Sequence, residues 1–125
     1  MRVLLIDDDP LVRETLAETL ADEGIEVAGL ANAEDALVLL GAGQVPDVLV
    51  ADIDLGPGLS GLDLAAIARE RHPAVEVVLI SGMPPGPGRI SHASRHERFL
   101  RKPFAPAVLA EAVRAAATAA AAGRP

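Results

Sequence analysis

The feature that most constrains the fold of this chain is a regular alternation of short strand-like runs with helix-like segments. Unbroken apolar runs are typical of strands covered on both faces, and strand–helix–strand alternation favours parallel pairing. One run alternates apolar and polar residues instead, as an edge strand does. The sequence therefore predicts an α/β fold with a doubly wound, five-stranded parallel sheet. Its strands are expected at 3–6, 25–27 (the edge), 48–51, 75–80 and 97–101.

Helix starts are marked by side chains that can cap free backbone N–H groups. Asp9 precedes Pro10, a residue suited to the first helical position. Asn32 precedes a second helix, and Ser60 with Asp63 three positions later is typical of a capping box. The expected helices run from 10 to about 23, from 32 to about 40, from 60 to about 72 and from 106 to near the end of the chain.

The segment 83–96 should hold one more helix between the last two strands, but its composition opposes helix formation. Three prolines and two glycines lie within 84–88. Each interior proline costs ~3 kcal/mol and each glycine ~1 kcal/mol relative to alanine. This fourth helix is therefore expected to be short or irregular. His92 and His96 are four positions apart but have no third metal ligand beside them, so both are expected in solvent.

Composition narrows the class of protein. At 125 residues the chain is long enough for one domain, and it has no cysteine for disulfides, thiolate zinc sites or nucleophiles. The formal net charge is −7, and there is no tryptophan or tyrosine. Neither nucleic acid nor an anionic membrane is therefore an expected partner. No apolar run approaches ~18 residues, so we expect a cytoplasmic protein without a membrane span.

The chemically capable side chains all follow predicted strands. Asp7 and Asp8 follow the first strand, Asp52 the third, Ser81 the fourth and Lys102 the fifth. In an open parallel sheet, these strand ends border the crevice where ligands bind. Crowded carboxylates repel one another unless a cation bridges them, and oxygen ligands suit Mg²⁺. Carboxylate, Mg²⁺, ammonium and hydroxyl groups in one crevice are the components of a phosphoryl-transfer site.

This combination resembles the receiver domain of two-component response regulators, along essentially the whole chain. The resemblance lies in four stretches, at 3–10, 46–55, 79–82 and 99–104. It implies a receiver domain over 1–122 with a tail at 123–125, and the flavodoxin-like strand order 2-1-3-4-5. That order places the alternating run at 25–27 at a sheet edge, in agreement with its pattern.

The resemblance also implies a role for each carboxylate. Asp52 would be phosphorylated to an acyl phosphate. Asp8 and Asp52 would bind Mg²⁺ directly, with the backbone carbonyl of Asp54 as a third protein ligand. Asp7 would act mainly through water.

The remaining site residues are implied in the same way. Lys102 would pair with Asp52 or its phosphoryl group, and its peptide bond to Pro103 would be cis. Ser81 and Phe99 would form a switch pair, although Ser81 in a turn and Phe99 in plain edge-strand packing remain alternatives. The implied partners are a histidine kinase or a histidine phosphotransfer protein, and a downstream protein target that the sequence does not identify.

Two other functions compete with this one. The Asp52-Ile53-Asp54 segment also satisfies the nucleophile pattern of haloacid-dehalogenase-like phosphatases, but only Glu111 follows Lys102 where that family needs an acidic motif. A receiver-like binding protein that is never phosphorylated would be expected to lack Asp52, Asp8 or Lys102. We therefore expect a signalling module, not an enzyme, that catalyses only its own phosphorylation and dephosphorylation. Whether it is free-standing or part of a longer protein is left open.

Overall fold

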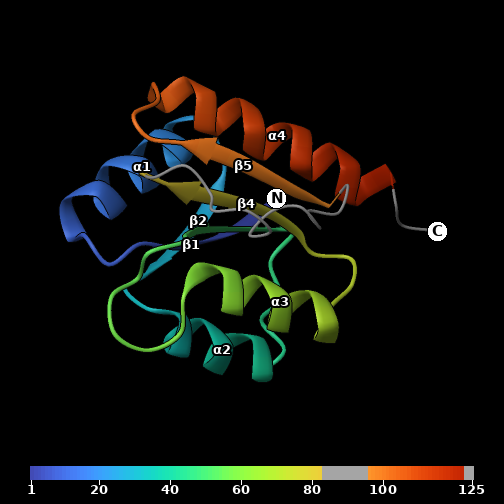
Figure 1. The fold of residues 1–125 in the computed structure, drawn as a ribbon. Coiled ribbons are helices and arrows are strands. Elements are labelled where there is room, and N and C mark those ends of the chain that lie inside the picture. Colours follow the sequence, from blue (N-terminus) through green and yellow to red (C-terminus); the bar gives the residue numbers. More distant parts are fainter. Residues whose placement is uncertain (83–95, 123–125) are drawn as a thin grey trace.

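A computed structural model describes residues 1–82 and 96–122 of the chain. These described residues form five strands and four helices (Figure 1). The predicted irregular helix falls on residues 83–95, which lie outside the described part. In chain order the elements are β1 (Arg2–Ile6), α1 (Pro10–Asp22), β2 (Glu26–Leu30), α2 (Ala33–Gly41), β3 (Val48–Asp52), α3 (Gly61–Arg71), β4 (Glu76–Ser81), β5 (Glu97–Arg101) and α4 (Pro106–Ala122).

The five strands form one parallel sheet in the order β2-β1-β3-β4-β5, which confirms the predicted fold class and strand order. The edge strand β2 continues to Leu30, three residues beyond the alternating run that predicted it. Since all strands point the same way, their carboxyl ends meet along one side of the sheet. Asp52, the last residue of β3, lies opposite Ile80 of β4. The central strand therefore delivers its carboxylate between β1 and β4.

Helices cover both faces of the sheet, as the unbroken apolar runs predicted (Figure 1). α1 and α4 pack on one face, where Leu20 and Leu109 are fully buried. α2 and α3 pack on the other, where Leu40 and Leu64 lie in a second apolar cluster. Burying each such leucine contributes roughly 1.5–3 kcal/mol to stability. The sheet is thus held on both sides, and its carboxyl edge is a rigid base for loops.

The predicted caps form at the starts of α1, α2 and α3. The side chain of Asp9 accepts hydrogen bonds from two backbone N–H groups of α1, and Asn32 accepts one from α2. Ser60 and Asp63 form the reciprocal capping box of α3. Each cap stabilises its helix by about 1 kcal/mol. The helices therefore begin soon after the strands, which keeps the strand-end loops short beside β1 and β2.

The start of α3 is pressed against the end of β3. The backbone N–H of Gly61 donates to the carbonyl of Ile53 at 2.9 Å. A Cβ atom at Gly61 would lie 2.2 Å from the backbone oxygen of Asp52, closer than any real contact. Only glycine permits this approach. The loop between β3 and α3 is thereby anchored directly to the backbone of the strand end.

Candidate functional site

Three carboxylates converge at the carboxyl edge of the sheet. Asp7 and Asp8 follow β1, and Asp52 ends the neighbouring strand β3. One oxygen from each carboxylate lies within 4.8 Å of the other two. Asp7 and Asp52 are buried, whereas Asp8 is exposed. The acidic residues that the sequence placed at two separate strand ends thus form one cluster with an opening to solvent.

Asp7 is held firmly, but one of its carboxylate oxygens accepts no hydrogen bond among the described residues. Its backbone N–H donates to the carbonyl of Leu30 at 3.1 Å, and its Oδ1 accepts from the backbone N–H of Asp9 at 2.9 Å. Within the described part of the chain, its buried Oδ2 has no hydrogen-bond partner. Burial raises the pKa of Asp7, outweighing the lowering by the Asp9 hydrogen bond and by Lys102. A buried oxygen without a donor is a preformed acceptor for a cation or its water.

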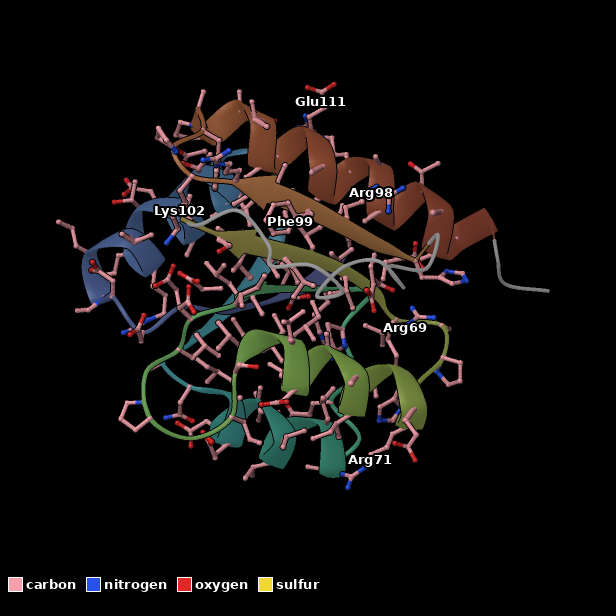
Figure 2. All side chains as sticks on the ribbon, viewed as in Figure 1. Arg69, Arg71, Arg98, Phe99, Lys102 and Glu111 are labelled. Carbon is pink, nitrogen blue, oxygen red and sulfur yellow. The ribbon has the colours of Figure 1, made fainter. Side chains whose placement is uncertain are left out.

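Lys102 extends from the end of β5 into this cluster (Figure 2). Its Nζ donates to Asp52 Oδ2 at 2.7 Å and lies 3.9 Å from Asp7 Oδ2. Burial alone would lower the pKa of Lys102, but the hydrogen bond and charge of Asp52, with smaller contributions from Asp7 and Asp8, raise it. The ammonium therefore stays protonated at neutral pH. Its backbone N–H donates to Ser81 O at 2.8 Å.

The peptide bond between Lys102 and Pro103 is cis. Asp54 lies just beyond β3, where its backbone N–H donates to Asp52 Oδ1 at 3.0 Å. The carboxylate of Asp54 is exposed and is not one of the three in the cluster. Both oxygens of Asp52 are thus engaged, one by Lys102 and the other by the loop that follows the strand.

Ser81 and Phe99 lie on adjacent strands. Ser81 is buried at the end of β4, and β5 pairs with β4 so that Phe99 stands opposite Leu79. Because side chains alternate along a strand, Leu79 and Ser81 point to the same face, and Phe99 shares it. Phe99 is half-buried and packs against the apolar cluster beneath α2 and α3. The structure therefore brings a hydroxyl and an aromatic ring to one face of the sheet, with Ser81 at the carboxyl end of its strand.

The donor set fits a hard divalent cation. Its ligand atoms are all oxygens, three carboxylates contribute them, and the buried Asp7 Oδ2 is without a donor among the described residues. Mg²⁺ prefers such oxygen ligands and keeps several waters, which the opening beside Asp8 allows. The cluster is able to bind a metal ion, and Lys102 adds a second cation beside it.

One charged cluster was missed by the sequence analysis. Glu76 of β4 is buried with 1% exposure, and its Oε2 lies 2.6 Å from Nδ1 of His96. Arg98 of β5 approaches Glu76 Oε1 at 3.6 Å. The prediction that His96 lies in solvent is wrong, because a buried carboxylate on the neighbouring strand holds its ring. The signal was a glutamate inside an otherwise apolar strand. This cluster lies at the amino ends of the strands, far from the carboxylates.

Fold and crevice together define a flavodoxin-like α/β protein with an acidic cluster and a lysine at the carboxyl edge of its sheet. The chain belongs to the response regulator receiver domain family, whose model matches residues 3–114. The receiver resemblance inferred from the four sequence stretches is thereby confirmed. Receiver domains of this family serve two-component phosphorelay signalling.

Individual relatives agree with this assignment. The chain is 37% identical over 120 residues to the C4-dicarboxylate transport transcriptional regulatory protein DctD of Pseudomonas aeruginosa, covering 92% of this chain and 25% of that protein. It is 44% identical over 84 residues to protein-glutamate methylesterase/protein-glutamine glutaminase 5 of Anaeromyxobacter dehalogenans, covering 66% of this chain and 23% of the relative. The chain thus spans about a quarter of the length of these two curated relatives.

A solved structure extends the agreement to the whole described fold. The response regulator receiver protein from Sinorhizobium medicae superposes with a TM-score of 0.87 at 30% identity, covering 96% of both chains. A receiver domain protein from Methanospirillum hungatei shares the fold at a TM-score of 0.87 and 22% identity, covering 98% of both chains. Among the described residues, no helix has the length and apolar character needed to cross a membrane.

Proposed function

We propose that this chain accepts a phosphoryl group on Asp52 from the phosphohistidine of a histidine kinase or a histidine phosphotransfer protein. The receiver domain would span residues 1–122, with 123–125 as a tail. The observation that carries the proposal is the Asp52 carboxylate, which ends the central strand within an acidic cluster and receives the Lys102 ammonium at 2.7 Å. A downstream protein target then responds to the phosphorylated form.

The proposed transfer exchanges one bond to phosphorus for another. A carboxylate oxygen of Asp52 attacks phosphorus and forms a P–O bond while the P–N bond of phosphohistidine breaks. The imidazole keeps the electron pair of that bond and leaves as a neutral ring, with a proton on its other nitrogen. The product is an acyl phosphate on Asp52. Catalysis of such a transfer consists mainly of positioning and charge stabilisation.

Lys102 supplies the fixed positive charge in this proposal. Its ammonium contacts Asp52 before transfer and can follow the phosphoryl oxygens afterwards, because its side chain is about one third exposed. Ser81 would donate its hydroxyl to a phosphoryl oxygen. Phe99 would turn inward as Ser81 moves, since both side chains occupy the same face of adjacent strands.

The cation assigned to the cluster is Mg²⁺. Asp8 and Asp52 would bind it directly, with the backbone carbonyl of Asp54 as a third protein ligand, and Asp7 would bind through water. When bound, the ion would neutralise charge on the phosphoryl oxygens. The Oδ2 of Asp7, which accepts no hydrogen bond among the described residues, and the exposure of Asp8 support this division of roles.

The proposed signalling module acts on its own aspartate in the cytoplasm and turns over no external substrate. A phosphatase of the haloacid-dehalogenase type would need a further carboxylate near the lysine. The carboxylate group next to Lys102 in the described structure consists of Asp7, Asp8 and Asp52, so Glu111 of α4 is not part of it. Neither nucleic acid nor membrane has a part in the proposed function.

The proposal is tested by incubating the protein with acetyl phosphate and Mg²⁺ and then measuring its intact mass. We expect wild type to gain the mass of one phosphoryl group, and the gain to disappear in EDTA. Asp52→Asn should gain none, whereas Asp22→Asn, a control at the exposed end of α1, should behave as wild type. Phosphorylation of Asp52→Asn at the wild-type rate would refute the assigned acceptor.

A further inference from the structure

Arg13 of α1 reaches from its helix to the backbone of the acidic strand end. Its Nη1 donates to the carbonyl oxygen of Asp7 at 2.8 Å in a partly buried position. The aliphatic part of its side chain passes close to Gly29 of β2. A Cβ atom at Gly29 would stand 3.3 Å from Cγ and 3.4 Å from Cδ of Arg13. The missing side chain of Gly29 thus makes room for the arginine.

This hydrogen bond completes the fixation of Asp7. Its backbone N–H is bound to Leu30, its carboxylate to the N–H of Asp9, and its carbonyl to Arg13. Because a peptide unit is planar, holding the carbonyl of Asp7 also fixes the N–H and Cα of Asp8. The carbonyl is drawn toward α1. The direction in which the exposed Asp8 carboxylate leaves the backbone is therefore set in part by Arg13.

We propose that Arg13 is a positioning residue for the divalent cation of the acidic cluster. By orienting the peptide between Asp7 and Asp8, it places the Asp8 oxygen within 4.8 Å of those of Asp7 and Asp52. Gly29 contributes to this positioning, because the absence of a side chain there lets Arg13 lie close to β2. The inference rests on the metal site of the proposed function and assigns these two residues a part in it.

A simpler role for Arg13 would be to tie α1 to β2. Such a tie would affect the free energy of unfolding but not the geometry of the carboxylates. Removing the arginine charge would also mislead, since a nearby positive charge itself weakens cation binding. Variants that keep the charge avoid this confusion. In Arg13→Lys the amine ends one bond short of Nη1, and an ammonium is a compact, strongly hydrated ion, so the contact with Asp7 should be lost.

Gly29→Val approaches the same contact from the other side. Since even a Cβ would crowd the arginine stem, the two added methyl groups force Arg13 to move while its charge remains. Two matched controls are available. Arg71→Lys makes the same exchange at the exposed end of α3, on the opposite side of the sheet from α1 (Figure 2). Ala28→Val also introduces a valine at the neighbouring, exposed position of β2, whose side chain points to the opposite face.

The test is isothermal titration calorimetry of the 125-residue chain with MgCl₂, without any phosphate donor. Loss of a group that orients a metal ligand typically weakens metal affinity 10–100-fold. We expect Arg13→Lys and Gly29→Val to raise the Mg²⁺ Kd about tenfold or more on that basis. Arg71→Lys and Ala28→Val should stay within about twofold. In the metal-free protein, NMR should show the Asp7 carbonyl carbon and the Asp8 amide shifted in the first pair and unchanged in the controls.

The outcomes separate this inference from the proposed function. If wild type binds Mg²⁺ and both folded variants bind it within twofold of wild type, Arg13 is only a structural tie and the inference is wrong. An unfolded Gly29→Val leaves Arg13→Lys to decide the question. If wild type itself binds no Mg²⁺, the assigned metal site fails, and this inference fails with it. Lower stability of the variants, without a change in the Mg²⁺ Kd, would count against the inference.

Discussion

Replacing Asp7 by asparagine should stabilise the metal-free protein, although the residue lies at the centre of the proposed site. The amide has nearly the same shape as the carboxylate, so its oxygen can still accept from the N–H of Asp9. Its NH₂ group can donate to the carboxylates of Asp8 and Asp52, which in wild type repel the Asp7 carboxylate. The substitution therefore exchanges a buried, partly unpaired charge for a neutral group with partners.

The magnitude follows from the distances. At an effective dielectric constant of about 20, two unit charges 4.8 Å apart repel by about 3.5 kcal/mol. Asp52 repels Asp7 on this scale, and Asp8 less, because it is exposed. The Lys102 ammonium, 3.9 Å from Asp7 Oδ2, attracts the Asp7 carboxylate by about 4 kcal/mol, which roughly cancels the repulsion from Asp52. What remains is the desolvation of the unpartnered Oδ2, about 1–3 kcal/mol. Asp7→Asn should gain that amount.

Urea unfolding followed by far-ultraviolet circular dichroism measures the gain, since the chain has no tryptophan to report by fluorescence. In EDTA at pH 7, the free energy of unfolding of Asp7→Asn should exceed that of wild type by about 1–3 kcal/mol. Glu18→Gln, which neutralises an exposed carboxylate on α1, is the control and should change little. A variant no more stable than wild type would refute the reasoning.

Adding Mg²⁺ and lowering the pH should both reduce the difference in the free energy of unfolding between Asp7→Asn and wild type. At 100 times its Kd, Mg²⁺ would stabilise wild type by about 2.7 kcal/mol. Asp7→Asn should gain less in the proposed site, where Asp7 binds the ion through a water molecule. The pKa of Asp7 is raised in the folded state, so the folded protein binds a proton there more tightly than the unfolded chain. The cost of its charge is therefore present above the folded pKa and disappears as the pH falls toward the ordinary value of 3.8. If the stability difference between Asp7→Asn and wild type increased as the pH was lowered, this account would be contradicted.

Two further predictions concern the geometry around Asp52. Gly61→Ala should lower the free energy of unfolding measured in urea by about 3 kcal/mol or more, because its Cβ would lie 2.2 Å from the Asp52 backbone oxygen. Gly41→Ala is the control, since no atom lies within 4 Å of the position of its Cβ. Lys102→Arg should leave the fold intact but impair phosphorylation-dependent switching, since a planar guanidinium cannot take the compact position of the ammonium 2.7 Å from Asp52. Normal phosphorylation-induced chemical-shift changes in the Lys102→Arg spectrum would remove Lys102 from its assigned role.

Much of this architecture could be predicted from sequence because each element carries its own local signal. Asp9, Asn32 and Ser60 marked helix starts within a residue of the observed ones, since capping depends only on neighbouring N–H groups. The order of the strands came from alternation and from family resemblance. The cluster at the carboxyl edge followed, because parallel strands must end on the same side.

What the sequence could not give depends on contacts between distant segments. Glu76 looked like one polar residue in an apolar strand, and only the pairing of β4 with β5 shows that His96 and Arg98 surround it. Likewise, Arg13 appeared as an ordinary charge on α1. Its contact with the Asp7 carbonyl requires the position of Gly29 on β2, which no local pattern specifies.

The pairing of Lys102 with Asp52 also has a consequence for synthesis of the chain. The two residues are 50 positions apart, and Lys102 sits at the end of the sheet's last strand. A nascent chain that has exposed β1 to β4 would carry the three crowded carboxylates without their lysine counter-charge. Because β5 and Lys102 are synthesised after these carboxylates, their docking would relieve that repulsion. In the proposed function, a nascent chain that has not yet reached Lys102 would present the Asp52 carboxylate without the ammonium that supports phosphoryl transfer.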